Sequence, residues 1–115
     1  MQPTTEELEK QNLADFARVM QLRLQEEPKN PDGWYMLGMA FLQGELVDQA
    51  AIAFSHANRL DPQRDDIALS YAQTLVFSQR GQLSTLSREL LMQVLNKNPQ
   101  HEGALLLMGM GAYRS

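Results

Sequence analysis

Apolar residues recur along most of the chain at the three- and four-residue spacing that places side chains on one face of a helix. The clearest example is residues 31–43, where Trp34, Leu37, Gly38 and Phe41 follow this spacing. The pattern predicts an all-α fold of about six helices, without strands. The expected helices cover residues 5–27, 31–43 and 46–60, and further helices begin at Asp65, after Gly81 and at Glu102.

Residues at the ends of these segments support the expected boundaries. Thr4 followed by Glu7 is the pattern of a capping box, in which each side chain caps a backbone amide near the start of a helix. Pro31 suits a first helical turn, and the Asp61–Pro62 step ends the helix before it. In the first helix, one face is expected to carry the large apolar residues Leu8, Leu13, Phe16, Met20 and Leu24.

Prolines mark an internal repeat. Pro28 and Pro62 lie 34 residues apart, and Pro99 lies 37 residues further on. A period of 34 residues is typical of helix–turn–helix units that bury their apolar faces only by stacking on one another, which produces a concave surface. We therefore expect a single domain over residues 1–115. Its parts are a leading helix at 5–27, a repeat at 31–64, an extended repeat at 65–101 and a partial repeat at 102–115.

The second repeat is three residues longer than the first. Gly44 and Gly81 each lie 18 residues before a proline, which predicts that they are equivalent and that the extra residues lie between Leu75 and Gly81. In the second helix of this repeat, Ser87, Leu91 and Val94 are then expected in the places of Ala50, Phe54 and Ala57. The third repeat has only one helix, so either the chain is a piece of a longer one or this helix leaves an apolar face open to another molecule.

Residues 31–64 resemble the tetratricopeptide repeat at eight signature positions: Trp34, Leu37, Gly38, Phe41, Ala50, Phe54, Ala57 and Pro62. The resemblance implies a right-handed superhelix of antiparallel helix pairs. It also implies that the first helix of each unit lines the concave groove with four side chains. These positions are Asp32, Tyr35, Met39 and Leu42, then Asp66, Leu69, Gln73 and Val76, then Gly103, Leu106, Met110 and Tyr113.

Most of these twelve groove positions are apolar. Asp32 and Asp66 form an acidic rim, and such a surface suits an amphipathic helix with a basic flank. Some related repeats clamp a C-terminal carboxylate with Lys, Arg and Asn, but none of these residue types stands at the twelve positions. Met39 and Met110 fit a surface that accepts varied side chains, whereas Met36 and Met108 are expected in the core.

A narrower resemblance covers nearly the whole chain. A leading helix, the repeat NPDGWYMLGMAFLQGELVDQAAIAFSHANRLDPQ, the stretched segment SYAQTLVFSQRGQLS and the final NPQHEGALLLMGMGAY are similar to the periplasmic repeat domain of the cytochrome c maturation proteins of the CcmI, CycH and NrfG type. This resemblance implies a periplasmic domain, tethered to the inner membrane in the whole protein. It also implies two kinds of partner: the C-terminal helix of apocytochrome c and other subunits of the heme-ligation complex.

Charge and composition disfavour several classes of function. The formal net charge of −4 disfavours binding to nucleic acid or anionic lipid, and the absence of cysteine excludes disulfides and thiolate chemistry. The N-terminus is polar, unlike a signal peptide, and no run of 18 apolar residues suggests a membrane span. His56 and His101 are expected on an outward helix face and in a turn, not as metal or heme ligands, and no catalytic motif is present.

We therefore expect a binding module without cofactor or enzymatic activity. Two alternatives remain at this point. One is a scaffold that binds a different protein or associates with itself through the final helix. The other is an enzyme or heme carrier, which would need an axial ligand such as His56.

Overall fold

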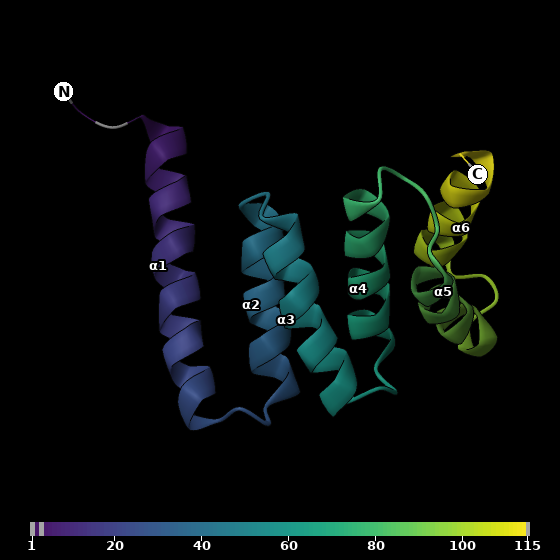
Figure 1. Ribbon diagram of the computed structural model, residues 1–115, viewed down its shortest axis with the longest axis horizontal. Coiled ribbons are helices and arrows are strands. Elements are labelled where there is room, and N and C mark those ends of the chain that lie inside the picture. Colours follow the sequence, from purple (N-terminus) through teal and green to yellow (C-terminus); the bar gives the residue numbers. More distant parts are fainter. Residues whose placement is uncertain (1, 3, 115) are drawn as a thin grey trace.

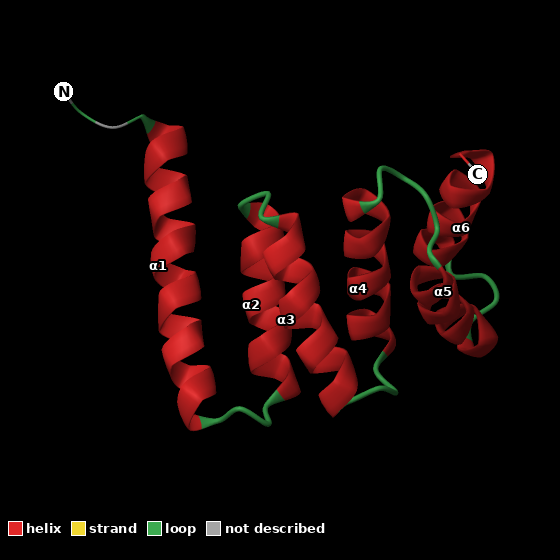
Figure 2. Cartoon of the chain, viewed as in Figure 1, coloured by secondary structure: helices red, strands yellow, loops and turns green. Residues whose placement is uncertain are grey.

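The computed structural model describes residue 2 and residues 4–114, with side chains up to residue 110, and within that part of the chain it contains helices and no strand (Figure 2). The sequence-based prediction of an all-α fold is therefore confirmed. The helices are α1 (Thr5–Glu26), α2 (Pro31–Gln43), α3 (Val47–Leu60), α4 (Asp65–Ser78), α5 (Thr85–Lys97) and α6 (Glu102–Arg114).

The helices follow one another along the longest axis of a body that measures 48 × 34 × 21 Å (Figure 1). α2 pairs with α3, and α4 pairs with α5, while α3 packs on α4 to join the two pairs. α1 packs on α2 at one end, and α6 packs on both α5 and α4 at the other. This succession is the stacking of helix pairs that the 34-residue period predicts.

Caps fix the starts of the helices as the sequence indicates. The Thr4 hydroxyl accepts a hydrogen bond from the Glu7 amide, and the Glu7 carboxylate accepts one from the Thr4 amide, so the predicted capping box is confirmed. The Asn30 side chain accepts hydrogen bonds from two amides in the first turn of α2. These contacts satisfy donors that have no partner inside the helix.

The register predicted for the second helices of the two repeats is confirmed by burial. Residues from both helices are fully buried at corresponding places: Ala50, Phe54 and Ala57 in α3, and Ser87, Leu91 and Val94 in α5. Leu91 and Val94 belong to a core shared with α4 and α6, which includes Ala68, Ala72 and Ala104. A second core joins α1 to α2 and α3 and includes Met20, Leu24 and Leu37.

The leading helix is less buried than its apolar pattern predicts. Ala17, Met20 and Leu24 are buried, but Leu8 and Phe16 are exposed. The reason is that, among the described residues, α2 is the only helix with an extensive contact to α1. This single neighbour covers a stripe that is narrower than the apolar face of α1.

The predicted position of the three extra residues in the second repeat, between Leu75 and Gly81, is right for one of them and wrong for the other two. The amide of Gly81 donates to the carbonyl of Val76, as the amide of Leu46 donates to that of Phe41, so Gly81 corresponds to Leu46 and not to Gly44. α4 is one residue longer than α2, and the remaining extra residues follow Gly81 in the loop before α5. Gly81 has a φ of 87°, a conformation that favours glycine, and this requirement explains its presence without any equivalence to Gly44.

Gly38 and Gly109 occupy corresponding places in α2 and α6 but have opposite surroundings. A Cβ atom at Gly38 would lie 2.6 Å from Cε1 of the Phe54 ring, whereas a Cβ atom at Gly109 would meet nothing within 4 Å in the described part of the chain. We expect Gly38→Ala to lower the free energy of unfolding by about 1–2 kcal/mol, because the clash outweighs the gain in helix propensity. Gly109→Ala should instead raise it by about 1 kcal/mol. Urea unfolding of the two variants tests this, and equal changes of the same sign would contradict the packing at Gly38.

Candidate peptide-binding site

The residues expected on the groove side of α2 lie at its surface or close to it. Asp32 is exposed, and Tyr35, Met39 and Leu42 are half-buried. The Tyr35 hydroxyl lies 3.4 Å from Oγ of Ser70 in α4, and its ring centroid lies 5.8 Å from that of Phe54. Tyr35 therefore stands between α2 and α4, where the two repeats meet.

Met39 borders a hollow between α1 and α2 that sequence reasoning did not predict. The hollow measures about 380 Å³ and is lined by Leu13, Phe16, Met36, Met39, Ala40 and Gln43. Met36 was expected in the core, but 47% of its surface is exposed, because it borders this hollow, where α1 and α2 do not pack closely. Met108, the other methionine expected in the core, is half-buried against the core that α4, α5 and α6 share.

On α4, the predicted set needs one correction. Asp66 is exposed, and Leu69 and Gln73 are half-buried, but Val76 is fully buried. Val76 belongs to the core that α4 shares with α5 and α6. Phe77, four residues after Gln73 and therefore its neighbour on the helix surface, is 48% exposed and was missed.

The last helix contributes the most exposed apolar side chain among the described residues of the predicted set. Leu106 is 66% exposed, and Met110, four residues later, is also exposed. Gly103 lies at the contact of α6 with α4, since a Cβ atom there would lie 3.6 Å from Cδ2 of Leu69. The side chain of Tyr113 lies outside the described residues.

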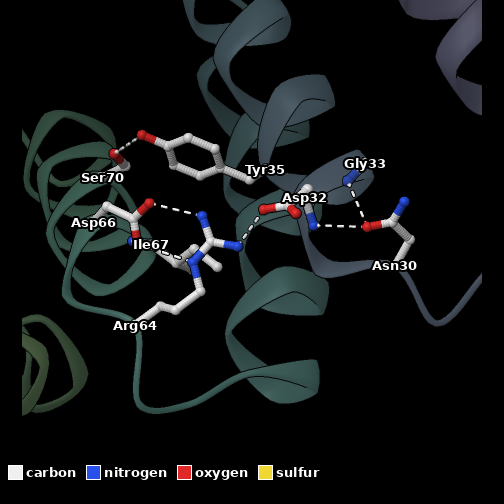
Figure 3. A network of polar contacts seen from close by, with 8 residues as sticks. All are labelled: Asn30, Asp32, Gly33, Tyr35, Arg64, Asp66, Ile67 and Ser70. Atoms are coloured by element: carbon white, nitrogen blue, oxygen red, sulfur yellow. Dashed lines mark hydrogen bonds and ion pairs between the residues drawn. The ribbon is translucent and has the colours of Figure 1, made fainter.

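The predicted acidic rim is present, but a cation lies within it (Figure 3). Arg64, in the loop between α3 and α4, donates from Nε to Oδ1 of Asp66 at 3.1 Å and from Nη2 to Oδ2 at 2.7 Å. Its Nη1 atom donates to Oδ1 of Asp32. The hydrogen bonds and charge of Arg64 lower the pKa of Asp66 below its usual value. Arg64 has no place in the helical periodicity, so no pattern in the sequence marked it.

Both histidines have contacts within the chain. The His56 ring stacks on Trp34 with a centroid separation of 4.3 Å, and its Nδ1 atom lies 2.7 Å from Nη2 of Arg59. Nδ1 of His101 accepts a hydrogen bond from the Ala104 amide at the start of α6. In the described part of the chain, no three His, Asp or Glu side chains gather as a metal site would require.

The opposite side of α2 borders a different cleft. It measures about 560 Å³ and lies between α1, α2 and α3, with Leu24, Trp34, Phe41 and Ile52 among its lining residues. Trp34, Leu37 and Phe41 follow each other on the side of α2 that faces away from Tyr35 and Met39. The cleft is therefore separate from the predicted groove.

The succession of helix pairs and the repeat residues that support it agree with a family comparison over the full sequence. Residues 1–115 match the family model described as the tetratricopeptide-repeat domain of cytochrome c-type biogenesis protein H. The chain belongs to this family. The resemblance noted from the sequence is therefore confirmed at the level of the family.

Several individual proteins that resemble the chain are named for cytochrome c biogenesis or for a nitrite reductase complex. The chain is 29% identical over 113 residues to the cytochrome c-type biogenesis protein CcmH of Escherichia coli, which covers 98% of this chain and 32% of that protein. It is 33% identical over 90 residues to the formate-dependent nitrite reductase complex bifunctional subunit NrfFG of Haemophilus influenzae, which covers 77% of this chain and 23% of that protein.

A further relative is the cytochrome c-type biogenesis protein CycH of Pseudomonas aeruginosa, 28% identical over 102 residues, or 89% of this chain and 25% of that protein. The chain thus spans about a third or less of the length of the curated relatives it matches. None of the helices in the described residues combines the length and the apolar character needed to cross a bilayer.

Proposed function

We propose that this domain is a non-catalytic binding module in c-type cytochrome biogenesis that holds the C-terminal helix of apocytochrome c on the surface formed by α2, α4 and α6. One observation carries the proposal: these three helices expose large apolar side chains, namely Met36, Phe77, Leu106 and Met110, in a domain whose family is named for this process. Solvent-exposed apolar side chains of this size are typical of surfaces that bind an amphipathic helix.

The expected strength of binding follows from the apolar area. A peptide that buries about 400 Å² of apolar surface gains roughly 10 kcal/mol of gross transfer free energy. The loss of translational freedom and the ordering of side chains remove much of this gain, which leaves about micromolar affinity. Such binding is reversible, as an adaptor that passes its ligand on requires. We place the domain in the periplasm, as part of a longer protein tethered to the inner membrane and associated with other subunits of the heme-ligation complex.

Titration of the domain with the C-terminal helix peptide of a c-type cytochrome, and with the same cytochrome folded around its heme, tests this function. We expect micromolar binding of the peptide and none of the folded protein, because folding buries the helix that the groove would contact. Isothermal calorimetry measures both. Equal binding of the two ligands, or binding of neither, would exclude the proposed role.

A second candidate function is assembly through the final helix. Leu105 is exposed. Gly38 in α2 packs on the Phe54 ring, whereas the corresponding Gly109 in α6 has open space beside it. These features favour a further helix, from another molecule, on this side of α6. Sedimentation of the isolated chain distinguishes the two functions, since a monomer that binds the peptide supports the groove, and a dimer that does not bind it supports assembly.

A further inference from the structure

The acidic rim of the groove already contains a basic side chain from the same chain. Asp32 begins α2 and Asp66 begins α4, and the guanidinium of Arg64 lies between their carboxylates (Figure 3). It engages both oxygens of Asp66 and one oxygen of Asp32. Its central carbon lies 5.8 Å from the centroid of the Tyr35 ring.

These are the contacts that a basic residue of a bound peptide would seek. A guanidinium or ammonium group is recognised by paired carboxylates and by an aromatic ring within about 6 Å. Here Arg64 already contacts both kinds of partner. Asp32, Asp66 and Arg64 together carry a net charge of −1, whereas the two carboxylates alone would carry −2. A basic side chain from a ligand would have to displace Arg64 or bind only the remaining carboxylate oxygen of Asp32.

The arrangement is held more firmly than most surface ion pairs. The Ile67 amide donates to Oδ1 of Asp66 at 2.9 Å, which fixes this carboxylate at the first turn of α4. The Asn30 side chain accepts from the Asp32 amide and so fixes the start of α2. The Arg64 side chain is 30% exposed, and its fork on Asp66 makes two parallel hydrogen bonds. This bidentate geometry distinguishes it from single exposed pairs, which contribute little.

We infer that Arg64 is a specificity-determining residue of the groove, because its guanidinium occupies the position that a basic side chain of the ligand would otherwise take. The groove of the unmodified protein then selects its ligand by apolar surface and not by positive charge. The inference rests on the proposed function for the identity of the ligand. It differs from the expectation that the acidic rim receives a basic flank.

Two amphipathic helical peptides that differ only by lysine or norleucine at one end test the inference. At low ionic strength we expect the wild-type domain to bind them with dissociation constants within about twofold of each other, because its rim is already paired. Arg64→Gln should prefer the lysine peptide by about fivefold, and adding Asp32→Asn to this variant should remove most of the preference. High salt should also remove it, because the charges are exposed.

Lys97→Gln is the matched control. Lys97 also pairs with an acid, Asp65, and donates to the carbonyl of Gln63, but it lies on α5. The substitution changes the net charge by the same amount as Arg64→Gln, so a general electrostatic effect would appear in both variants. We expect no lysine preference in Lys97→Gln. If Arg64→Gln does not fold, as judged by its circular dichroism, Arg64→Met keeps the aliphatic contacts of the side chain and serves in its place.

A marked lysine preference in the wild type, or none in the Arg64 variant, would overturn the inference. If neither peptide binds any form, the proposed function fails, and spermidine then tests Arg64 alone. Its binding is followed by the amide shifts of residues 32 and 66. About fivefold tighter binding to the variant than to the wild type supports the inference, and equal binding overturns it.

Discussion

Replacement of Phe54 by alanine is expected to lower the free energy of unfolding by about 3–5 kcal/mol. Phe54 is fully buried, and its ring fills the space that Gly38 leaves between α2 and α3. Removal of the ring leaves a cavity that the helices cannot close without losing their contact at Gly38. Because a domain of this size is stable by only about 5–15 kcal/mol, the loss should be visible as a large shift of the urea midpoint.

Phe77→Ala is the control for this prediction. It also removes a phenyl ring, but from a residue of α4 that is 48% exposed. We expect a loss below about 1 kcal/mol, because a ring that is already half in water gives up little transfer free energy on removal. Comparable losses in the two variants would show that the pairing of α2 with α3 through Gly38 and Phe54 is not as described.

The second large effect concerns binding. Leu106→Glu is expected to weaken binding of the apocytochrome peptide at least about tenfold, a change of about 1.4 kcal/mol. Leu106 is 66% exposed on α6, so the free domain tolerates a carboxylate there, but an apolar helix seated on that surface would strip the carboxylate of water. Calorimetric titration gives the affinity, and thermal unfolding shows whether the variant retains its stability.

Ile52→Glu provides the comparison. Ile52 is 60% exposed, close to the exposure of Leu106, but it lies on α3 beside the cleft between α1, α2 and α3. We expect its substitution to leave the affinity for the peptide unchanged. An equal loss in both variants, or a loss confined to Ile52→Glu, would place the ligand on the wrong side of the domain for the proposed function.

Much of the fold followed from local signals in the sequence. Two of these signals depend only on contacts within one helix or one helix pair. They are the capping pattern of Thr4 and Glu7 and the small residues at the equivalent positions Ala50 and Ser87. The capping box can be predicted from the residue types at the start of one helix, and the small residues at Ala50 and Ser87 from the period of the repeat. The equivalence of Gly44 and Gly81 failed because Gly81 meets a different need, a positive φ after α4.

The candidate site was harder to predict because burial in it depends on neighbours outside the repeat. Val76 is buried in a core that α4 shares with both α5 and α6, and Met36 is exposed because α1 covers only part of α2. No position within a repeat carries this information. Arg64 was missed for a different reason: a loop residue has no periodicity, and its role becomes visible only when the starts of α2 and α4 come together.

The most direct test of the account is to locate the peptide on the domain by amide chemical shifts during titration with the C-terminal helix of apocytochrome c. Binding in the groove predicts shifts that concentrate around Met39, Phe77 and Leu106 on α2, α4 and α6, while Ile52 on α3 and Met92 on α5 stay unchanged. Shifts that instead concentrate around Ile52 and Trp34, at the cleft on the other side of α2, would contradict it.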